Sequence, residues 1–80
     1  MNLNIALFGI AREIVGASSL AVTVAPGQSA AGLLAELRQQ YPELAKLRSL
    51  AVAVNNDYAA DDVALHERDE IALIPPVAGG

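Results

Sequence analysis

The sequence predicts a small α+β domain, in which a mixed sheet of four or five strands carries one main helix on one face. Several short stretches alternate large apolar residues with small or polar ones, and this period of two is typical of strands. A single stretch after residue 29 repeats its apolar residues with the period of a helix. One helix can cover only one face of a sheet, so the pattern disfavours a doubly wound α/β fold. The 80 residues suffice for one domain.

The first third of the chain predicts two strands joined by a short helical turn. Residues 3–7 alternate and form the first strand. Residues 11–15 form the helical turn, and Gly16 is placed to end it in the left-handed conformation. The alternation returns in residues 20–24, the second strand, which ends before the turn-forming pair Pro26-Gly27.

The main helix is predicted to begin after Ser29, a residue that caps helix N-termini well, and to end at Pro42. Its apolar residues share one stripe: Leu33, Leu34, Leu37 and Tyr41. Leu44 and Leu47 are predicted to lie in a short connecting segment.

Three more extended pieces complete the sheet. Residues 50–54 form the third strand, and residues 55–57 have the composition of a turn. A short extended piece begins at Tyr58. Residues 70–74 form the last strand, because the following prolines cannot donate to a strand ladder.

The strand alternation also separates the two faces of the sheet. The side chains expected to face the helix are Leu3, Ile5, Leu7, Val22, Val24, Val52, Val54, Ile71 and Leu73. The set expected on the uncovered face is small and apolar: Ala6, Phe8, Ala21, Thr23, Ala51, Ala53, Ala72 and Ile74. The simpler interpretation is that alanine is tolerated there in an alanine-rich chain, but this does not explain Phe8 and Ile74. We therefore interpret this face as an interface with a partner.

The composition excludes several classes of function. The chain has no cysteine, so it has no disulfide framework and no thiolate nucleophile, and its one histidine cannot form a metal site alone. Five basic residues and a net charge of −4 argue against nucleic-acid binding. No apolar run approaches the roughly 20 residues of a membrane span. We expect a cytoplasmic protein that binds no metal, no nucleic acid and no membrane.

The acidic residues are concentrated toward the end of the sequence. Residues 1–56 hold four basic and three acidic residues, whereas residues 57–80 hold six acidic residues and one basic residue. The simpler interpretation is a solvated acidic loop region. The alternative is that this end of the domain meets a basic partner surface, where its charge would mainly speed the encounter.

No group of side chains has the pattern of a catalytic site. The serines lack the sequence surroundings of an activated nucleophile, and His66 lies in a predicted surface turn. The acids at 61–62 and 69–70 could act as acid and base only in a pocket that raised a pKa, and solvated loop acids are far more common. The chain is therefore predicted not to be an enzyme by itself.

The last six residues differ from the rest of the chain. We therefore divide the chain into a domain of residues 1–74 and an extended tail of residues 75–80. Two prolines at the start of the tail favour extended backbone and reduce the entropy lost on docking. Gly79 and Gly80 would fit a slot too narrow for any side chain. The terminal carboxylate is ionised and unreactive until an enzyme converts it to a mixed anhydride, for instance with AMP.

Four stretches of the chain resemble the small, sulfur-carrying subunits of molybdopterin synthase, which have the ubiquitin-like β-grasp fold. They are LFGIAREIVG (7–16), LLAELRQQYP (33–42), AVAVNNDY (51–58) and DEIALIPPVAGG (69–80). The ending PPVAGG is the most specific, because it is similar to the PPVSGG or PPVTGG of that family. The family often has Asp-Gly-Asp-Glu where residues 67–70 read Glu-Arg-Asp-Glu, so the resemblance does not predict the geometry of that turn.

The resemblance implies a carrier function. An E1-like adenylating enzyme would use ATP to activate the Gly80 carboxylate, and a sulfurtransferase relay would convert it to a thiocarboxylate. The large synthase subunit would accept the tail and pass its sulfur to cyclic pyranopterin monophosphate, in a heterotetramer of two small and two large subunits. The chain itself would hold no cofactor stably. The residues implied for tail insertion are Pro75, Pro76, Val77, Ala78 and Gly79, and those implied for the partner interface are Phe8, Tyr58 and Ile74.

Two other functions stay open. The same tail could serve a carrier of the thiamine type or a protein modifier, although a modifier that forms chains would need acceptor lysines and Lys46 is the only lysine. Alternatively, the domain could be a ubiquitin-like interaction module that binds through the face of Phe8 and Ile74, with an inert tail. Deleting Gly80 would abolish a carrier function and leave an interaction module unaffected.

Overall fold

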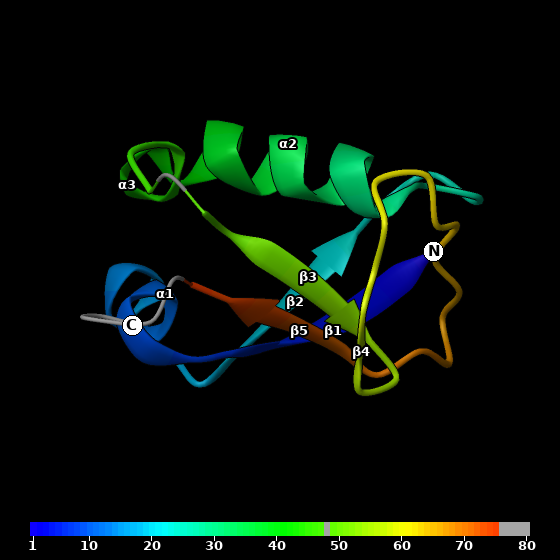
Figure 1. The fold of residues 1–80 in the computed structure, drawn as a ribbon, viewed down its shortest axis with the longest axis horizontal. Coiled ribbons are helices and arrows are strands. Elements are labelled where there is room, and N and C mark those ends of the chain that lie inside the picture. The colour runs from blue at the N-terminus through cyan, green and yellow to red at the C-terminus, as the bar shows by residue number, and fades with distance from the viewer. Residues whose placement is uncertain (48, 76–80) are drawn as a thin grey trace.

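The computed structural model describes residues 1–47 and 49–75. Its elements are β1 (Asn2–Leu7), α1 (Gly9–Val15), β2 (Ser19–Thr23), α2 (Ala30–Gln40), α3 (Pro42–Ala45), β3 (Ala51–Val54), β4 (Asp57–Tyr58) and β5 (Ile71–Ile74). The predicted α+β class is confirmed, and so is the order of the strands around one main helix (Figure 1).

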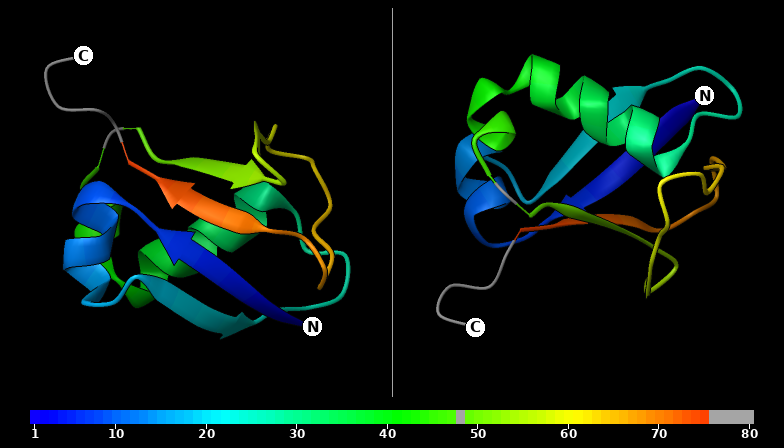
Figure 2. Two further views of the ribbon diagram at one scale, coloured as in Figure 1. Left: turned by 90° about the horizontal axis from the view of Figure 1, so that it is seen from below. Right: turned by 45° about the horizontal axis from the view of Figure 1, so that its top comes forward.

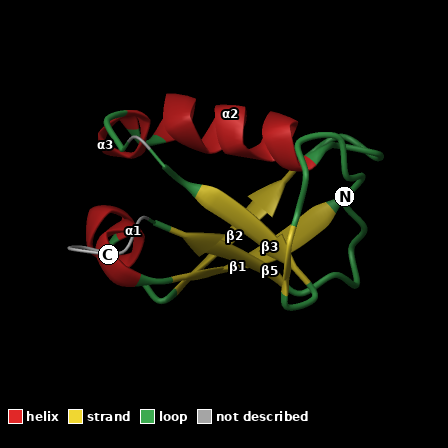
Figure 3. Cartoon of the chain, in the orientation of Figure 1, coloured by secondary structure: helices red, strands yellow, loops and turns green. Residues whose placement is uncertain are grey.

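The five strands form one mixed sheet in the order β2-β1-β5-β3-β4. The first strand pairs in parallel with the last, while β1–β2, β3–β5 and β3–β4 are antiparallel. Helix α2 lies across one face of this sheet (Figure 3). Viewed from the opposite side, the strands lie in front of α2, so no described helix covers that face (Figure 2).

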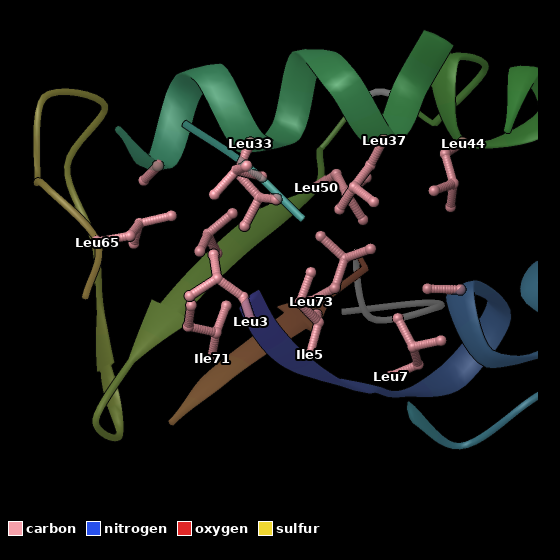
Figure 4. Packing of buried hydrophobic residues seen from close by; sticks show 14 residues of the cluster. Leu3, Ile5, Leu7, Leu33, Leu37, Leu44, Leu50, Leu65, Ile71 and Leu73 are labelled. Atoms are coloured by element: carbon pink, nitrogen blue, oxygen red, sulfur yellow. The ribbon is translucent and has the colours of Figure 1, made fainter. Parts of the chain in front are cut away.

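The core lies between the sheet and α2 (Figure 4). Of the side chains predicted to face the helix, seven are buried: Leu3, Ile5, Leu7, Val24, Val52, Ile71 and Leu73. The other two, Val22 and Val54, are half-buried against the core, because they lie on strands near the edges of the sheet. On α2, Leu33 and Leu37 of the predicted stripe are buried.

The start of α2 is capped from two directions. As predicted, Ser29 is the N-cap, and its hydroxyl oxygen accepts a hydrogen bond from the Gly32 N–H at 3.0 Å. The N–H groups of Ala30 and Ala31 donate at 2.9 and 3.0 Å to carbonyl oxygens in the loop of residues 59–70. The first N–H groups of a helix have no acceptor within the helix, so the loop supplies the carbonyl oxygens that water would otherwise have to replace. The same loop places Leu65, which the sequence analysis did not single out, in the core.

The connecting segment after α2 contains a short helix that was not predicted. This helix is α3, and Leu44 on it is fully buried. Pro42 explains both the end of α2 and the start of α3. Proline cannot continue α2, but its fixed φ and missing N–H suit the first position of a new helix.

The turn between β3 and β4 has two residues rather than the predicted three. Asn55 and Asn56 have positive φ angles of 52° and 72°, and Asp57 already belongs to β4. Asparagine tolerates this left-handed conformation better than most residues, and two such residues in a row make the tight turn that fits twisted hairpins.

The turn before β5 is built without the glycine that the related family often has there. The Asp69 carboxylate accepts the backbone N–H of His66 at 2.9 Å and the side-chain N–H of Asn55 at 3.1 Å. The side-chain oxygen of Asn55 accepts the backbone N–H of Glu70 at 3.0 Å. Among the described non-glycine residues, positive φ is confined to the two asparagines, so Arg68 needs no left-handed conformation.

These hydrogen bonds predict a small pH dependence of stability. They favour the carboxylate and lower the pKa of Asp69 below its ordinary value. The hydrogen bond from the His66 backbone contributes most, and the one from the Asn55 side chain comes second. The stabilisation is therefore present above the ordinary pKa and fades as the pH falls through the lowered one. We expect Asp69→Asn to lose up to about 1 kcal/mol of unfolding free energy at neutral pH, because the site is partly exposed.

The measurement is urea unfolding of Asp69→Asn and wild type between neutral and acidic pH. The difference should shrink as the pH falls below about 3.8. Asp62→Asn, a change at an exposed loop acid, controls for the altered net charge. A difference that stays constant with pH would show that ionisation of Asp69 is not involved.

Candidate functional site

The uncovered face of the sheet carries a groove of about 380 Å³. Three alanines lie in register across its central strands, with Ala6 opposite Ala72 and Ala72 opposite Ala53. Tyr58 is the next partner of Ala53 in the same row. The small side chains leave a hollow, and larger residues of neighbouring strands line it, among them Phe8 and Ile74.

The three predicted interface residues line this one groove, although Phe8 is far from the others in sequence. Phe8 is 52% exposed, Tyr58 is 73% exposed and Ile74 is half-buried. Parallel pairing brings Phe8 and Ile74 together, because they follow the partner residues Leu7 and Leu73. The tight hairpin turns β4 back along β3 and places Tyr58 opposite Ala53. Their role as contacts with a partner stays a prediction.

The uncovered face is not uniformly exposed, which corrects part of the prediction. Ala53 is only 7% exposed, because strands on both sides flank it and Tyr58 is its cross-strand partner. Ala6, Ala51 and Ala72 are half-buried, whereas Ala21 and Thr23 on β2 are exposed. The accessible apolar surface therefore comes mainly from the larger residues around the groove.

Ile10 is a large exposed side chain that the sequence analysis missed. It lies in α1 and is 45% exposed, but it does not line the groove. A helical period was the available signal: Ala11 is buried and Ile14 and Val15 are half-buried, at spacings of three and four residues. Ile10 lies four residues before Ile14, at the edge of this stripe, where its side chain remains exposed.

Of the predicted tail, only Pro75 is described. It is buried beside Gly9, where an added Cβ would lie 3.1 Å from the Pro75 Cγ atom. Since Gly9 follows Phe8, the tail begins next to the groove. The other predicted tail residues lie outside the described residues: Pro76, Val77, Ala78, Gly79 and Gly80. The division at residue 74 stays a prediction.

Other kinds of site find little support in residues 1–47 and 49–75. In that part of the chain, no three acidic or histidine side chains gather in a way that could hold a metal ion. No polar or charged residue is buried there either. None of the described helices is both long enough and apolar enough to span a bilayer.

Comparison with known proteins agrees with this architecture. The ThiS family model matches residues 5–80. The molybdopterin synthase sulfur carrier subunit of Arabidopsis thaliana is 36% identical over an alignment of 81 residues that covers 100% of this chain and 84% of the relative. The crystal structure of SAMP1 from Haloferax volcanii has a TM-score of 0.83 and 27% identity, with 100% of both chains covered.

A third likeness concerns an assembly. A structure from Helicobacter pylori, described as a complex of subunits 1 and 2 of molybdopterin-converting factor, matches with a TM-score of 0.67 and 23% identity, covering 100% of both chains. At that identity it shows the fold alone. The likeness to SAMP1, together with that to a ubiquitin from Caldiarchaeum subterraneum with a TM-score of 0.67 and 19% identity, confirms the ubiquitin-like β-grasp fold. The chain belongs to the ThiS family, together with the molybdopterin synthase sulfur carrier subunits that match it over its full length.

Proposed function

We propose that this chain is the sulfur carrier of a molybdopterin synthase and that Gly80 is the residue that carries the sulfur. One observation carries the proposal: the match to molybdopterin synthase sulfur carrier subunits spans the whole chain, and the family match reaches Gly80. The absence of cysteine agrees with it, because no side chain of this protein could hold sulfur as a thiol or persulfide.

The chemistry takes place at the Gly80 carboxylate. The carboxylate attacks the α-phosphate of ATP on an E1-like adenylating enzyme, which forms an acyl-adenylate and releases pyrophosphate. The outer sulfur of a persulfide on a sulfurtransferase then attacks the acyl carbon and displaces AMP, which forms an acyl disulfide. A second thiol cleaves the S–S bond of this intermediate, forms a disulfide with the sulfurtransferase and leaves the thiocarboxylate on Gly80. The chain supplies no catalytic side chain and binds no cofactor stably. It presents a carboxylate on a tail that the partner enzymes act on.

The groove serves as the docking surface in this proposal. The large subunit of the synthase is the partner, as the complex of subunits 1 and 2 from Helicobacter pylori suggests by analogy. An exposed aromatic pair beside small residues is the kind of surface that supplies most of the binding energy in protein interfaces. Pro75, where the predicted tail begins, lies beside Gly9, the residue that follows Phe8, so docking at the groove and insertion of the tail would occur on the same side of the domain.

A protein modifier is the second candidate function. The likeness to the Haloferax volcanii protein, which is also described as small archaeal modifier protein 1, favours it. A modifier would pass its activated carboxylate to an amine of a target protein rather than to sulfur. The two functions therefore share the adenylation step and differ in the product.

The intact mass of the untagged protein tests the proposal. The protein is incubated with ATP, the adenylating enzyme and a sulfurtransferase with its sulfur source. A gain equal to sulfur minus oxygen is expected, and that gain should disappear when the large subunit and cyclic pyranopterin monophosphate are added. An unchanged mass would contradict the carrier function, and an adduct with a second protein would favour the modifier.

Phe8→Asp is expected to weaken binding to the large subunit by about thirtyfold or more, the typical effect of removing a central aromatic residue. The fold should survive, because Phe8 is about half exposed. Isothermal titration calorimetry measures the affinity, and circular dichroism checks the fold. Ile10→Asp is the matched control: it also places a charge at an exposed apolar residue, but outside the groove. Equal losses in both variants would show that the interface is not confined to the groove.

A further inference from the structure

The groove continues into a second hollow on the same face of the sheet. This hollow has a volume of about 400 Å³ and shares Ala6, Glu70 and Ile71 with the groove. Its other lining residues include Glu67 and Asp69. The apolar groove and the second hollow thus form one continuous depression, with Glu70 at the junction.

The charged residues that line this depression are all acidic. Two of them already accept hydrogen bonds. Asp69 accepts the backbone N–H of His66 within the turn before β5, and Glu67 accepts the backbone N–H of Asn2 at 3.1 Å. Glu70 is exposed, and within the described residues its carboxylate has no hydrogen bond and no ion pair. It is therefore the acid that is left to bind a group from outside.

We propose that the depression binds a partner segment in which an apolar side chain is followed by a lysine or arginine, and that Glu70 receives the cation. The apolar side chain would lie on the alanines between Phe8 and Tyr58. The proposal rests on the proposed function, because it specifies the chemistry of the proteins that dock there. A second copy of this chain fits less well, since each copy carries a net charge of −4 and the same acids would meet.

The physical role of Glu70 is to speed and orient docking. A charge at the rim of an apolar interface adds little affinity in salt, but it accelerates association and penalises partners that lack the opposite charge. Screening reduces this contribution, because the Debye length is only about 8 Å at physiological ionic strength. The signature of Glu70 is therefore an association rate that depends on salt.

The test compares Glu70→Gln with wild type in binding to the large subunit and to the adenylating enzyme, by stopped-flow or surface plasmon resonance over a range of salt. We expect Glu70→Gln to slow association about two- to fivefold at low salt, with the difference vanishing at high salt. Glu70→Lys should slow it more. Glu36→Gln is the matched control, because Glu36 is an exposed acid on α2, across the sheet from the groove.

The outcomes separate this inference from the proposed function. Failure of the wild type to bind either enzyme would overturn the proposed function itself. Normal binding of the wild type, with Glu70→Gln equal to Glu36→Gln at every salt concentration, would overturn the role of Glu70. A loss in Glu70→Gln that does not change with salt would also overturn it, because a structural defect, and not charge, would then be the cause.

Discussion

A variant that ends at Gly79 is expected to gain no sulfur when it is incubated with ATP, the adenylating enzyme and the sulfur source. Removing one residue keeps a glycine carboxylate at the end of the chain but withdraws it by about 3.5 Å. Catalysis loses about a hundredfold when reacting atoms are misplaced by 1 Å, so the shortened tail should be inactive in practice. Intact mass spectrometry reads the result directly.

Two further variants complete this experiment. A chain extended by one alanine after Gly80 should be equally inactive, because its carboxylate overshoots the reaction centre. Replacing Gly79 with leucine should also block activation, since a narrow slot excludes the side chain. Binding of the truncated chain to the large subunit should persist through the groove. A mass gain in the chain that ends at Gly79 would contradict the assignment of Gly80.

Adjacent residues of β5 should respond in opposite ways to the same kind of truncation. Leu73 is buried in the core, whereas Ile74 is half-buried on the groove side. Leu73→Ala should cost about 2–5 kcal/mol of unfolding free energy, because it removes buried methyl groups and leaves a cavity. A domain of this size has only about 4–12 kcal/mol in total, so much of its stability should be lost.

Ile74→Ala provides the matched control. It should cost little stability, but it should weaken binding to the large subunit because it removes one side of the groove. Urea unfolding measures the first effect and calorimetry the second. A large loss of stability in Ile74→Ala would show that this residue belongs to the core and not to a binding surface.

Local patterns in the sequence predicted most of the elements correctly. The alternation around Leu3 and the helical stripe around Leu37 identify strand and helix, because a period of two or 3.6 residues follows directly from backbone geometry. The capping roles of Ser29 and Gly16 were also readable, since caps depend on one or two neighbouring residues. The helix α3 was missed because four residues are too few to show a period.

Long-range contacts account for what the sequence did not reveal. Near Leu65 only Val63 lies at a spacing of two, which is too short a run to predict a buried residue, and Leu65 is buried because its loop crosses to the start of α2. The Glu70 carboxylate lacks a hydrogen-bond partner within the described residues because of how the turn folds. In that turn the side-chain N–H of Asn55 donates to the Asp69 carboxylate instead. Neither feature has a local signature in the sequence.

Composition and short periods were enough to predict the class of fold, the two faces of each strand and the lack of any side chain that could carry sulfur. These conclusions depend on composition and on periods shorter than one element. That Phe8, Tyr58 and Ile74 line one groove, with Glu70 at its acidic end, follows from the packing of the strands in three dimensions. Alternation assigns a residue to a face but does not say which strands are neighbours, and the parallel pairing of β1 with β5 is what places the groove beside Pro75, where the predicted tail begins.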